Sequence, residues 1–326
     1  MKKILFRNLS LFLFAAICPV FISGCNEIKK ENPANAPAQA AAPNVKDESK
    51  NALRRRIEEI AADSQGKVGA AAIVLETGEA VGLNENEHFP MQSVYKFPIA
   101  MAVLKQVEQG NLKLEQKIRI EKSDLVPQQL RSPIRDKFPQ GTEMRLDEVL
   151  KYSVSDSDGT ACDVLLKAVG GAAVVTKYLR EIGIRDIVVA TTEKEMSQDE
   201  SVQYQNWASP AAANDLLRLL HEGRPLSESN RALLLGWMTE TPTGLKRLKG
   251  LLPAGTVVAH KTGTSGTFDG LTRATNDVGL ITLPGGKHLA VSVFVSDSKA
   301  DERTREEVIA KIARVVWDEF TKVTEK

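Results

Sequence analysis

Apolar positions recur along the chain with two different periods, one typical of helices and one typical of strands. Helical spacing, with apolar residues three and four apart, first appears in Asn51–Ala62 and last in Asp301–Phe320. The same spacing dominates the middle of the chain, where it predicts helices over these segments: Ser93–Gln109, Leu146–Lys151, Thr160–Val169, Ala172–Ile182, Pro210–His221 and Ser227–Glu240.

Short apolar runs bounded by turn residues predict strands near both ends of the chain. The predicted strands are Val68–Leu75, Ala80–Leu83, Thr256–Thr264, Asp277–Leu283 and His288–Ser296. We therefore predict an α+β fold, an α/β sandwich in which a five-stranded antiparallel sheet is built from both chain ends and has flanking helices. An inserted all-α lobe at approximately residues 90–250 completes it, and a site between the lobes is expected.

The first 25 residues differ in composition from the rest. A positive start that includes Lys2 and Arg7 precedes an apolar run, Leu9–Ile22, which is too short for a comfortable membrane span. This pattern predicts a signal peptide over residues 1–24. The small residues before Cys25 resemble a bacterial lipobox, in which the cysteine is acylated. The alternatives are an ordinary signal peptide or an uncleaved anchor.

Residues 25–50 carry no apolar periodicity and are rich in Ala, Pro, Asn and Lys. Such a segment buries too little surface to offset the entropy of ordering, so we predict a lipidated cysteine followed by a flexible linker. The catalytic domain is then expected over residues 51–326. The expected location is the periplasm, with the protein exported and held on a membrane by its lipid anchor.

Composition limits the possible partners. The formal net charge is +1, so no strong field favours nucleic acid. The four histidines are scattered, and there is no HExxH or CxxC motif, so no metal site and no cofactor are expected. Cys162 is the one cysteine in the predicted mature domain outside the lipid site, and its apolar helical setting predicts a buried structural thiol.

Ser93 and Lys96 are the first candidates for chemistry. A serine hydroxyl needs a base to become a nucleophile, and a lysine three residues later on a helix lies one turn away. The same spacing occurs at Ser64…Lys67 and at Ser296…Lys299, but neither of these opens an apolar helix. Only the pair at Ser93 does so.

Two triplets at element boundaries add to this pair. Ser157-Asp158-Gly159 precedes a predicted helix, and Lys261-Thr262-Gly263 with Thr264 ends a predicted strand. Alone, the first is a common turn or helix cap and the second a common strand exit. The ammonium and hydroxyl groups of the second suit a substrate carboxylate. The repeat Ser155-Asp156 leaves a second frame open for the first triplet.

With these motifs in order, residues 51–326 resemble the class A serine β-lactamases, a motif set long associated with that family. Segments 202–207 and 251–266 are most similar to its PER/VEB-type extended-spectrum branch. The resemblance implies a monomeric enzyme that hydrolyses the amide of β-lactam antibiotics through a serine acyl-enzyme and confers resistance. It implies cephalosporins, including extended-spectrum types, and penicillins as substrates.

The resemblance also implies residue roles. Ser93 is the acylated nucleophile, Lys96 its neighbouring base, and Ser157 relays a proton to the lactam nitrogen. Lys261, Thr262 and Thr264 bind the substrate carboxylate, and Gly263 belongs to the same substrate-binding motif. The oxyanion hole is formed by the backbone N–H groups of Ser93 and Thr264.

The family pattern also concerns three further positions. Counting back from Asn206-Trp207 places the deacylating carboxylate at Glu193, with Glu195 as the alternative. Arg247 stands where PER/VEB-type enzymes have an extra carboxylate-binding arginine, although a surface charge is the alternative. Gly159 replaces the Asn of most members, which removes a hydrogen-bond donor from the substrate subsite. A D,D-peptidase and a non-catalytic β-lactam-binding lipoprotein are the competing functions.

Overall fold

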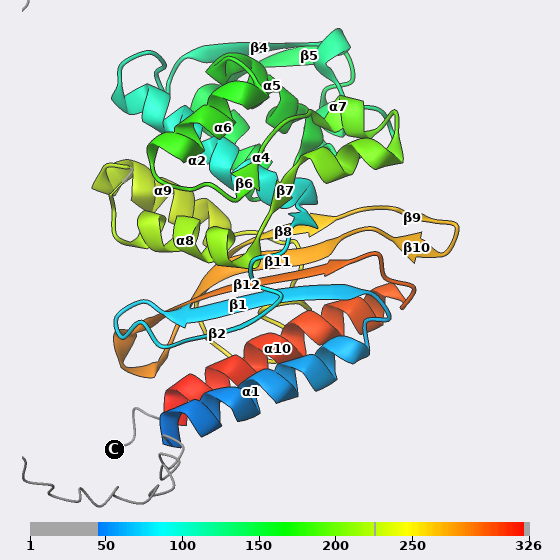
Figure 1. Ribbon diagram of the computed structural model, residues 1–326. Coiled ribbons are helices and arrows are strands. Elements are labelled where there is room, and N and C mark those ends of the chain that lie inside the picture. The colour runs from blue at the N-terminus through cyan, green and yellow to red at the C-terminus, as the bar shows by residue number, and fades with distance from the viewer. Residues whose placement is uncertain (1–44, 225, 323–326) are drawn as a thin grey trace, which may run out of the picture. The chain divides into compact units, whose positions relative to one another are not determined.

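A central sheet is the main feature of the computed structural model, which describes residues 45–224 and 226–322 (Figure 1). Its five strands run in the order β2-β1-β12-β11-β8, and every neighbouring pair is antiparallel. The bounds are β1 Lys67–Val74, β2 Ala80–Leu83, β8 Val258–Thr264, β11 Thr275–Thr282 and β12 His288–Ser296. The α+β class and the sheet built from both ends of the chain are thus confirmed.

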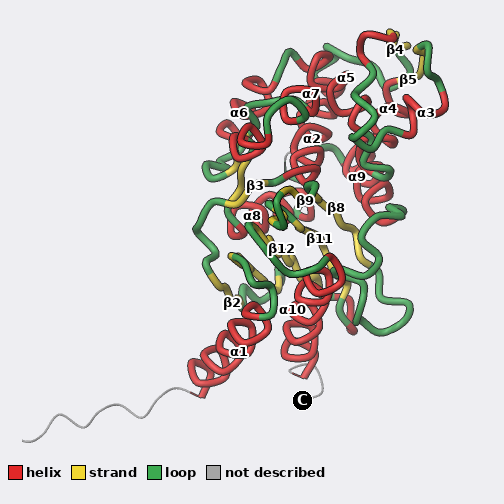
Figure 2. Tube along the Cα trace, turned by 90° about the vertical axis from the view of Figure 1, so that its right-hand side faces the viewer, coloured by secondary structure: helices red, strands yellow, loops and turns green. Residues whose placement is uncertain are grey.

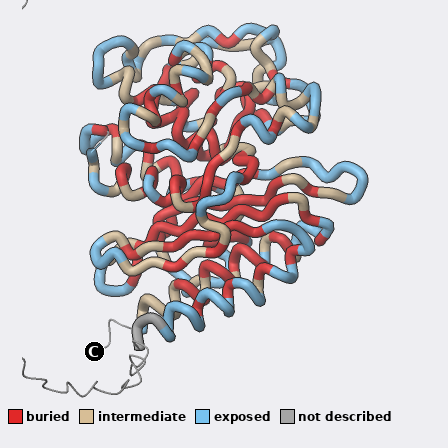
Figure 3. The backbone as a smooth tube through the Cα atoms, in the orientation of Figure 1, coloured by how far each residue is buried: buried red, intermediate tan, exposed pale blue. Residues whose placement is uncertain are grey.

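Helices cover both faces of this sheet (Figure 2). On one face lie α1 (Val45–Ala62) and α10 (Glu302–Lys322), which pack side by side, and on the other lies α8 (Pro210–His221). In β12, Val291 and Val293 belong to the core beneath α1 and α10, whereas Phe294 belongs to the larger core of the helical lobe. Successive side chains point to opposite faces, and both faces are covered, so the strand is buried along almost its whole length (Figure 3).

The inserted lobe is built around α2 (Lys96–Glu108). Every residue from Lys96 to Leu104 is buried, as expected of a helix that is apolar on all sides and packed among others. The helices around it are α4 Leu146–Val154, α5 Gly159–Val169, α6 Ala172–Glu181 and α9 Glu228–Thr239. No single helix among the described residues is long and apolar enough to cross a membrane. Helices α5 and α6, which are bent relative to each other, reach that length and composition only when taken together.

Several small elements were not predicted. Most have too few residues for apolar alternation to be visible, although Lys117–Glu121 (KIRIE) does alternate and was overlooked. They are two pairs, β4 Lys117–Glu121 with β5 Gly141–Arg145 and β9 Thr267–Phe268 with β10 Leu271–Thr272, and a three-stranded sheet of β3 Phe89–Pro90, β7 Trp207–Ala208 and β6 Ile187–Val188. The remaining short helices are η1 Gln92–Tyr95, η2 Lys122–Asp124, α3 Pro133–Lys137, α7 Glu193–Met196, η3 Glu200–Gln205 and η4 Pro284–Gly286. The lobe is therefore mainly helical and also contains small sheets.

The N-terminal helix begins earlier than the hydrophobic pattern indicated. It starts at Val45 rather than Asn51, so residues 45–50, predicted as linker, are helical. Ser49 donates a hydrogen bond to the Glu319 carboxylate of α10 at 2.6 Å, a partner that local sequence cannot reveal. The predicted signal peptide, Cys25 and most of the predicted linker lie outside the described residues.

Strand β8 meets the segment before η1 at very close range. Asn276 of β11 donates to the carbonyls of Pro90 and Met91, at 2.8 and 3.1 Å. A Cβ atom at Gly263 would lie far inside van der Waals contact with the Met91 carbonyl oxygen. Glycine at this position therefore lets the edge of the sheet approach the residue that precedes Gln92 and Ser93.

We expect Gly263→Ala to lower the free energy of unfolding by about 1–3 kcal/mol, because the added methyl group must push the two segments apart. Gly236→Ala in α9 is the control: nothing lies within 4 Å of its would-be Cβ, so this change should stabilise the protein by about 0.5–1 kcal/mol. Chemical denaturation of the two variants measures both effects. Equal stability of Gly263→Ala and the parent chain would show that the contact is not restrictive.

Candidate active site

Ser93 and Lys96 lie at the junction of a 3-10 helix and an α-helix. Ser93 is in η1, and Lys96 is the first residue of α2, so the two side chains are one turn apart. Lys96 Nζ donates a hydrogen bond to Ser93 Oγ at 2.7 Å. The Lys96 side chain is only 1% exposed. The hydroxyl is therefore held against a buried amine, as the spacing predicted.

Glu193 completes this group from a distant part of the chain. Its carboxylate forms a buried ion pair with Lys96 Nζ. Glu193 is the first residue of α7, and its backbone N–H and that of Lys194 donate to the Asp163 carboxylate at 2.8 and 3.1 Å. Asp163 on α5 thus fixes the start of α7 and directs the Glu193 side chain towards Lys96.

The geometry distinguishes Glu193 from Glu195. The Glu195 carboxylate accepts hydrogen bonds from the Thr191 hydroxyl at 2.8 Å and from the Thr192 backbone and hydroxyl at 2.8 and 3.0 Å. These bonds, led by the Thr192 backbone N–H, lower the pKa of Glu195. Glu195 therefore caps α7 in a capping box, and Glu193 is the carboxylate next to Ser93 and Lys96.

Lys261 carries the second ammonium group of the site, and it contacts the second serine, Ser157. Lys261 Nζ, fully buried on β8, donates to Ser157 Oγ at 2.9 Å and to the Thr262 carbonyl at 3.1 Å. Ser157 has φ +57°, a left-handed conformation that is uncommon for a residue with a side chain and is often found at functional sites. Ser155 instead donates to the Trp237 carbonyl at 2.7 Å, so Ser157 is the serine at Lys261.

Arg247 is a buried residue rather than a surface charge, with 3% of its area exposed. Its guanidinium donates to the Thr264 hydroxyl at 2.8 Å and to the carbonyls of Gly263 and Asn276 at 3.1 and 3.0 Å. It also forms an ion pair with Glu306 of α10 at 3.1 Å. Arg247 therefore orients Thr264 and brings a second positive charge to the end of β8.

These groups surround one cleft of about 660 Å³. Its walls include seven of the ten residues predicted to form the catalytic and binding site: Ser93, Lys96, Ser157, Glu193, Arg247, Thr262 and Thr264. Lys261 reaches the cleft only through the Ser157 hydroxyl. Gly263 faces the Met91 carbonyl, behind the cleft wall. Gly159 opens α5 with its N–H donating to the Arg131 carbonyl at 2.9 Å, and a Cβ atom there would lie 3.6 Å from Cγ of Glu193, so Gly159 lies just behind two residues of the cleft wall.

Burial and charge give the two lysines opposite shifts. Burial lowers the pKa of Lys96, but the Glu193 carboxylate and other nearby acidic groups raise it more, and the net pKa lies above its usual value. The pKa of Lys261 lies well below its usual value because of burial and the charge of Lys96. Proximity to a carboxylate thus raises the pKa of Lys96, whereas burial and the neighbouring positive charge lower the pKa of Lys261.

Three supporting residues complete the site; in the sequence analysis, Asp163 and Thr243 had no role and Asn206 marked the loop exit. Asp163 was assigned only to a buried helix, although an acidic residue in such a segment signals a partner. Thr243 shares a hydrogen bond of 2.8 Å with the Thr262 hydroxyl. The Asn206 side chain accepts from the backbone N–H groups of Ala190 and Thr191 at 2.8 and 3.1 Å and so closes the loop that carries α7. All three act across long sequence separations.

A serine with a buried lysine and carboxylate, and a second serine–lysine pair across the cleft, define an enzyme of the serine acyl-transfer class. A model of the Beta-lactamase enzyme family matches residues 52–320. Among curated relatives, β-lactamase VEB-1 of Pseudomonas aeruginosa is 43% identical over 82% of this chain and 90% of its own length. Extended-spectrum β-lactamase PER-1 of the same organism is 45% identical over 81% and 86%.

Solved structures agree with these sequence relatives. A β-lactamase from Chitinophaga pinensis DSM 2588 has 51% identity and a TM-score of 0.80, covering 82% of this chain and 99% of that one. The TLA-1 extended-spectrum β-lactamase has 44% identity and a TM-score of 0.82, covering 84% and 99%. The chain belongs to the β-lactamase enzyme family, as a serine enzyme of class A. It hydrolyses β-lactams, and the resemblance proposed from the motifs is confirmed.

The raised pKa of Asp163 predicts that the free energy of unfolding depends on pH. Burial, followed by the charge of Glu193, raises its pKa to about 6. In the unfolded chain the pKa is about 3.9, so between those values the native state holds a proton that the unfolded state has lost. The contribution of this group to stability therefore falls as the pH rises from about 4 to 6, by an amount on the order of 3 kcal/mol.

Asp163→Asn removes the titrating group and keeps an acceptor for the α7 backbone. We expect the parent chain to lose stability relative to this variant across that pH window, as measured by urea denaturation at several pH values. If the free energies of unfolding of the two proteins changed with pH in parallel, the raised pKa of Asp163 would be contradicted.

Proposed function

We propose that Ser93 attacks the β-lactam carbonyl and that Glu193 drives hydrolysis of the resulting ester. The observation that carries this assignment is the position of Lys96 Nζ, which contacts both Ser93 Oγ and the Glu193 carboxylate. One buried amine thereby connects the nucleophile to the carboxylate. A carboxylate beside an acylated serine can take a proton from water, which is the step that a blocked acyl-enzyme lacks.

In acylation, Lys96 passes a proton to Glu193 and its neutral amine then accepts the proton of Ser93. The Ser93 oxygen bonds to the lactam carbon, and the negative charge on the carbonyl oxygen is stabilised by the backbone N–H groups of Ser93 and Thr264. One such donor typically contributes about 2.7–4 kcal/mol to transition-state stabilisation. As the C–N bond breaks, Ser157 gives its proton to the nitrogen, and Lys261 stabilises the serine oxygen through its 2.9 Å hydrogen bond. Ser157 then takes a proton from Lys96, and Lys96 recovers one from Glu193, so Glu193 is again a carboxylate when the acyl-enzyme has formed.

In deacylation, the Glu193 carboxylate removes a proton from water, and the hydroxide bonds to the ester carbon. The C–O bond to Ser93 then breaks, and the serine oxygen recovers its proton from Lys96 or Glu193. The substrate carboxylate binds at the end of β8, where the hydroxyls of Thr262 and Thr264 line the cleft and Arg247 lies behind them. A charged hydrogen bond of this kind is stronger than a neutral one.

We propose extended-spectrum cephalosporins and penicillins as substrates. PER-1 and TLA-1, which are 45% and 44% identical to this chain, are both named extended-spectrum β-lactamases. A cleft of about 660 Å³ has the size of sites that enclose drug-sized ligands. Gly159 places no side chain in the substrate subsite, so binding there depends on the end of β8 instead.

The roles are tested with three variants in a chromogenic cephalosporin assay. Ser93→Ala should abolish turnover, because the nucleophile is removed. Glu193→Gln should acylate and then stall, which leaves a mass increase of one acyl group on the protein. Glu195→Gln is the matched control and should retain turnover, since Glu195 only caps α7.

Persistent hydrolysis by Ser93→Ala would contradict the nucleophile assignment. Rapid turnover by Glu193→Gln, with loss of activity in Glu195→Gln, would show that Glu195 is the general base of deacylation. A parent chain that is acylated without release would instead be a D,D-peptidase, if it cleaves D-Ala-D-Ala peptides, or a β-lactam-binding lipoprotein, if it does not.

We also propose that the protein is exported as a monomeric lipoprotein of the periplasm, anchored through Cys25. The support is the positive start, the short apolar run and the small residues before that cysteine. Several acyl chains at about 0.8 kcal/mol per buried CH₂ hold a protein stably on a bilayer.

Cys25→Ser should move the protein from the membrane fraction to the soluble fraction and abolish incorporation of labelled palmitate. Cys162→Ser is the control and should leave both unchanged, since Cys162 is buried in α5. Labelling that survives Cys25→Ser would contradict the lipid site.

A further inference from the structure

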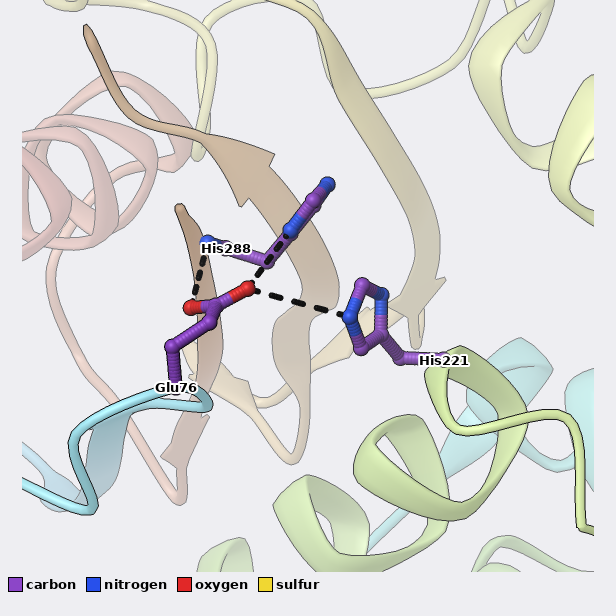
Figure 4. Close-up of side chains that lie close together, drawn as sticks. All are labelled: Glu76, His221 and His288. Carbon is purple, nitrogen blue, oxygen red and sulfur yellow. Dashed lines mark hydrogen bonds and ion pairs between the residues drawn. The ribbon is translucent and has the colours of Figure 1, made fainter. Parts of the chain in front are cut away.

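Two of the four histidines meet at the end of the sheet. Glu76 lies in the turn after β1, His221 is the last residue of α8, and His288 is the first residue of β12. Figure 4 shows the three side chains pointing toward one another from these three elements. Glu76 and His288 are 212 positions apart in sequence, which is why the scattered histidines gave no motif.

The distances suit a metal ion. One ligand atom from each of the three side chains lies within 4.8 Å of the other two. His288 Nδ1 is 2.9 Å from Glu76 Oε1, and His221 Nε2 is 3.8 Å from the same oxygen. A tetrahedral ion with bonds of about 2.1 Å holds its ligand atoms about 3.4 Å apart, so small side-chain movements bring these atoms into position.

The Glu76 carboxylate is already oriented by the backbone. Its Oε2 accepts a hydrogen bond from the His288 N–H at 2.9 Å, which holds Oε1 on the side of the two imidazole rings. The centroids of those rings are 4.2 Å apart. Each of the three side chains is 28–36% exposed, so an ion could enter and keep a water molecule as its fourth ligand.

We propose that Glu76, His221 and His288 bind a zinc ion through two imidazole nitrogens and one carboxylate oxygen. Nitrogen ligands favour zinc and its transition-metal neighbours over calcium and magnesium, which prefer oxygen. The ion links the β1–β2 turn, the end of α8 and the β11–β12 turn.

The site is separate from the cleft. Thr264 pairs with Thr275, which in turn pairs with Val295 of β12, and His288 begins that same strand. The run from Val295 to His288 spans about 23 Å at about 3.3 Å per residue. The site therefore adds a structural cross-link and takes no part in the steps proposed for Ser93.

The test uses the full-length chain, purified without a histidine tag and stripped with a chelator. Titration calorimetry with zinc chloride should show one ion per chain. Zinc at ten times its dissociation constant should raise the melting temperature by about 3 °C, because binding stabilises only the folded state. Cobalt should give the visible absorption of a tetrahedral site, and calcium should not bind.

His221→Ala, His288→Ala and the near-isosteric Glu76→Gln should each weaken zinc binding at least tenfold and abolish the temperature shift, while cephalosporin hydrolysis is unchanged. His88→Ala is the matched control, because His88 stacks on Trp207 outside the cluster, and it should bind zinc like the parent chain. Absence of zinc binding would leave only the observed hydrogen bonds and overturn the proposal. Zinc binding that the three variants retain, or that His88→Ala loses equally, would also overturn it.

Discussion

The buried ion pair between Lys96 and Glu193 is the contact on which the active site depends. Removing two charges from water is costly, and their attraction offsets that cost only when further hydrogen bonds satisfy the remaining groups. Here the Ser93 hydroxyl accepts from the ammonium group, while Asp163 holds the backbone at the start of α7. The loop that carries Glu193 is therefore positioned by charge and by backbone hydrogen bonds at the same time.

The sheet provides the second half of the cleft. Both chain ends contribute to it, so the lobe inserted between them begins and ends next to the sheet, and β8 lies against η1. The glycine at position 263 permits that approach, and the guanidinium of Arg247 joins the backbones of β8 and β11. Lys261 and Thr264 are thus presented across the cleft from Ser93 by rigid elements rather than by loops.

Sequence periodicity predicted the long elements because each has one or two faces in contact with a core. Motif order predicted Ser93, Lys96, Ser157 and Lys261, which the structure brings together in two hydrogen-bonded pairs. Periodicity could not predict β6 or β7, whose two residues each are ordered by neighbours rather than by their own pattern. Nor could it show that Asp163 supports α7, or that Gly159 lies beside Glu193, since both depend on contacts distant in sequence.

A double-mutant cycle on the free energy of unfolding tests the ion pair most directly, using Lys96→Met, Glu193→Gln and the combination of both. Each single change leaves a buried charge without its counterion, whereas the double change removes both charges. If the pair holds α7 against α2, the double variant should differ from the sum of the single effects by about 0.5–3 kcal/mol, in the direction of greater stability. Strictly additive effects would contradict a direct energetic link between the nucleophile's lysine and the water-activating carboxylate.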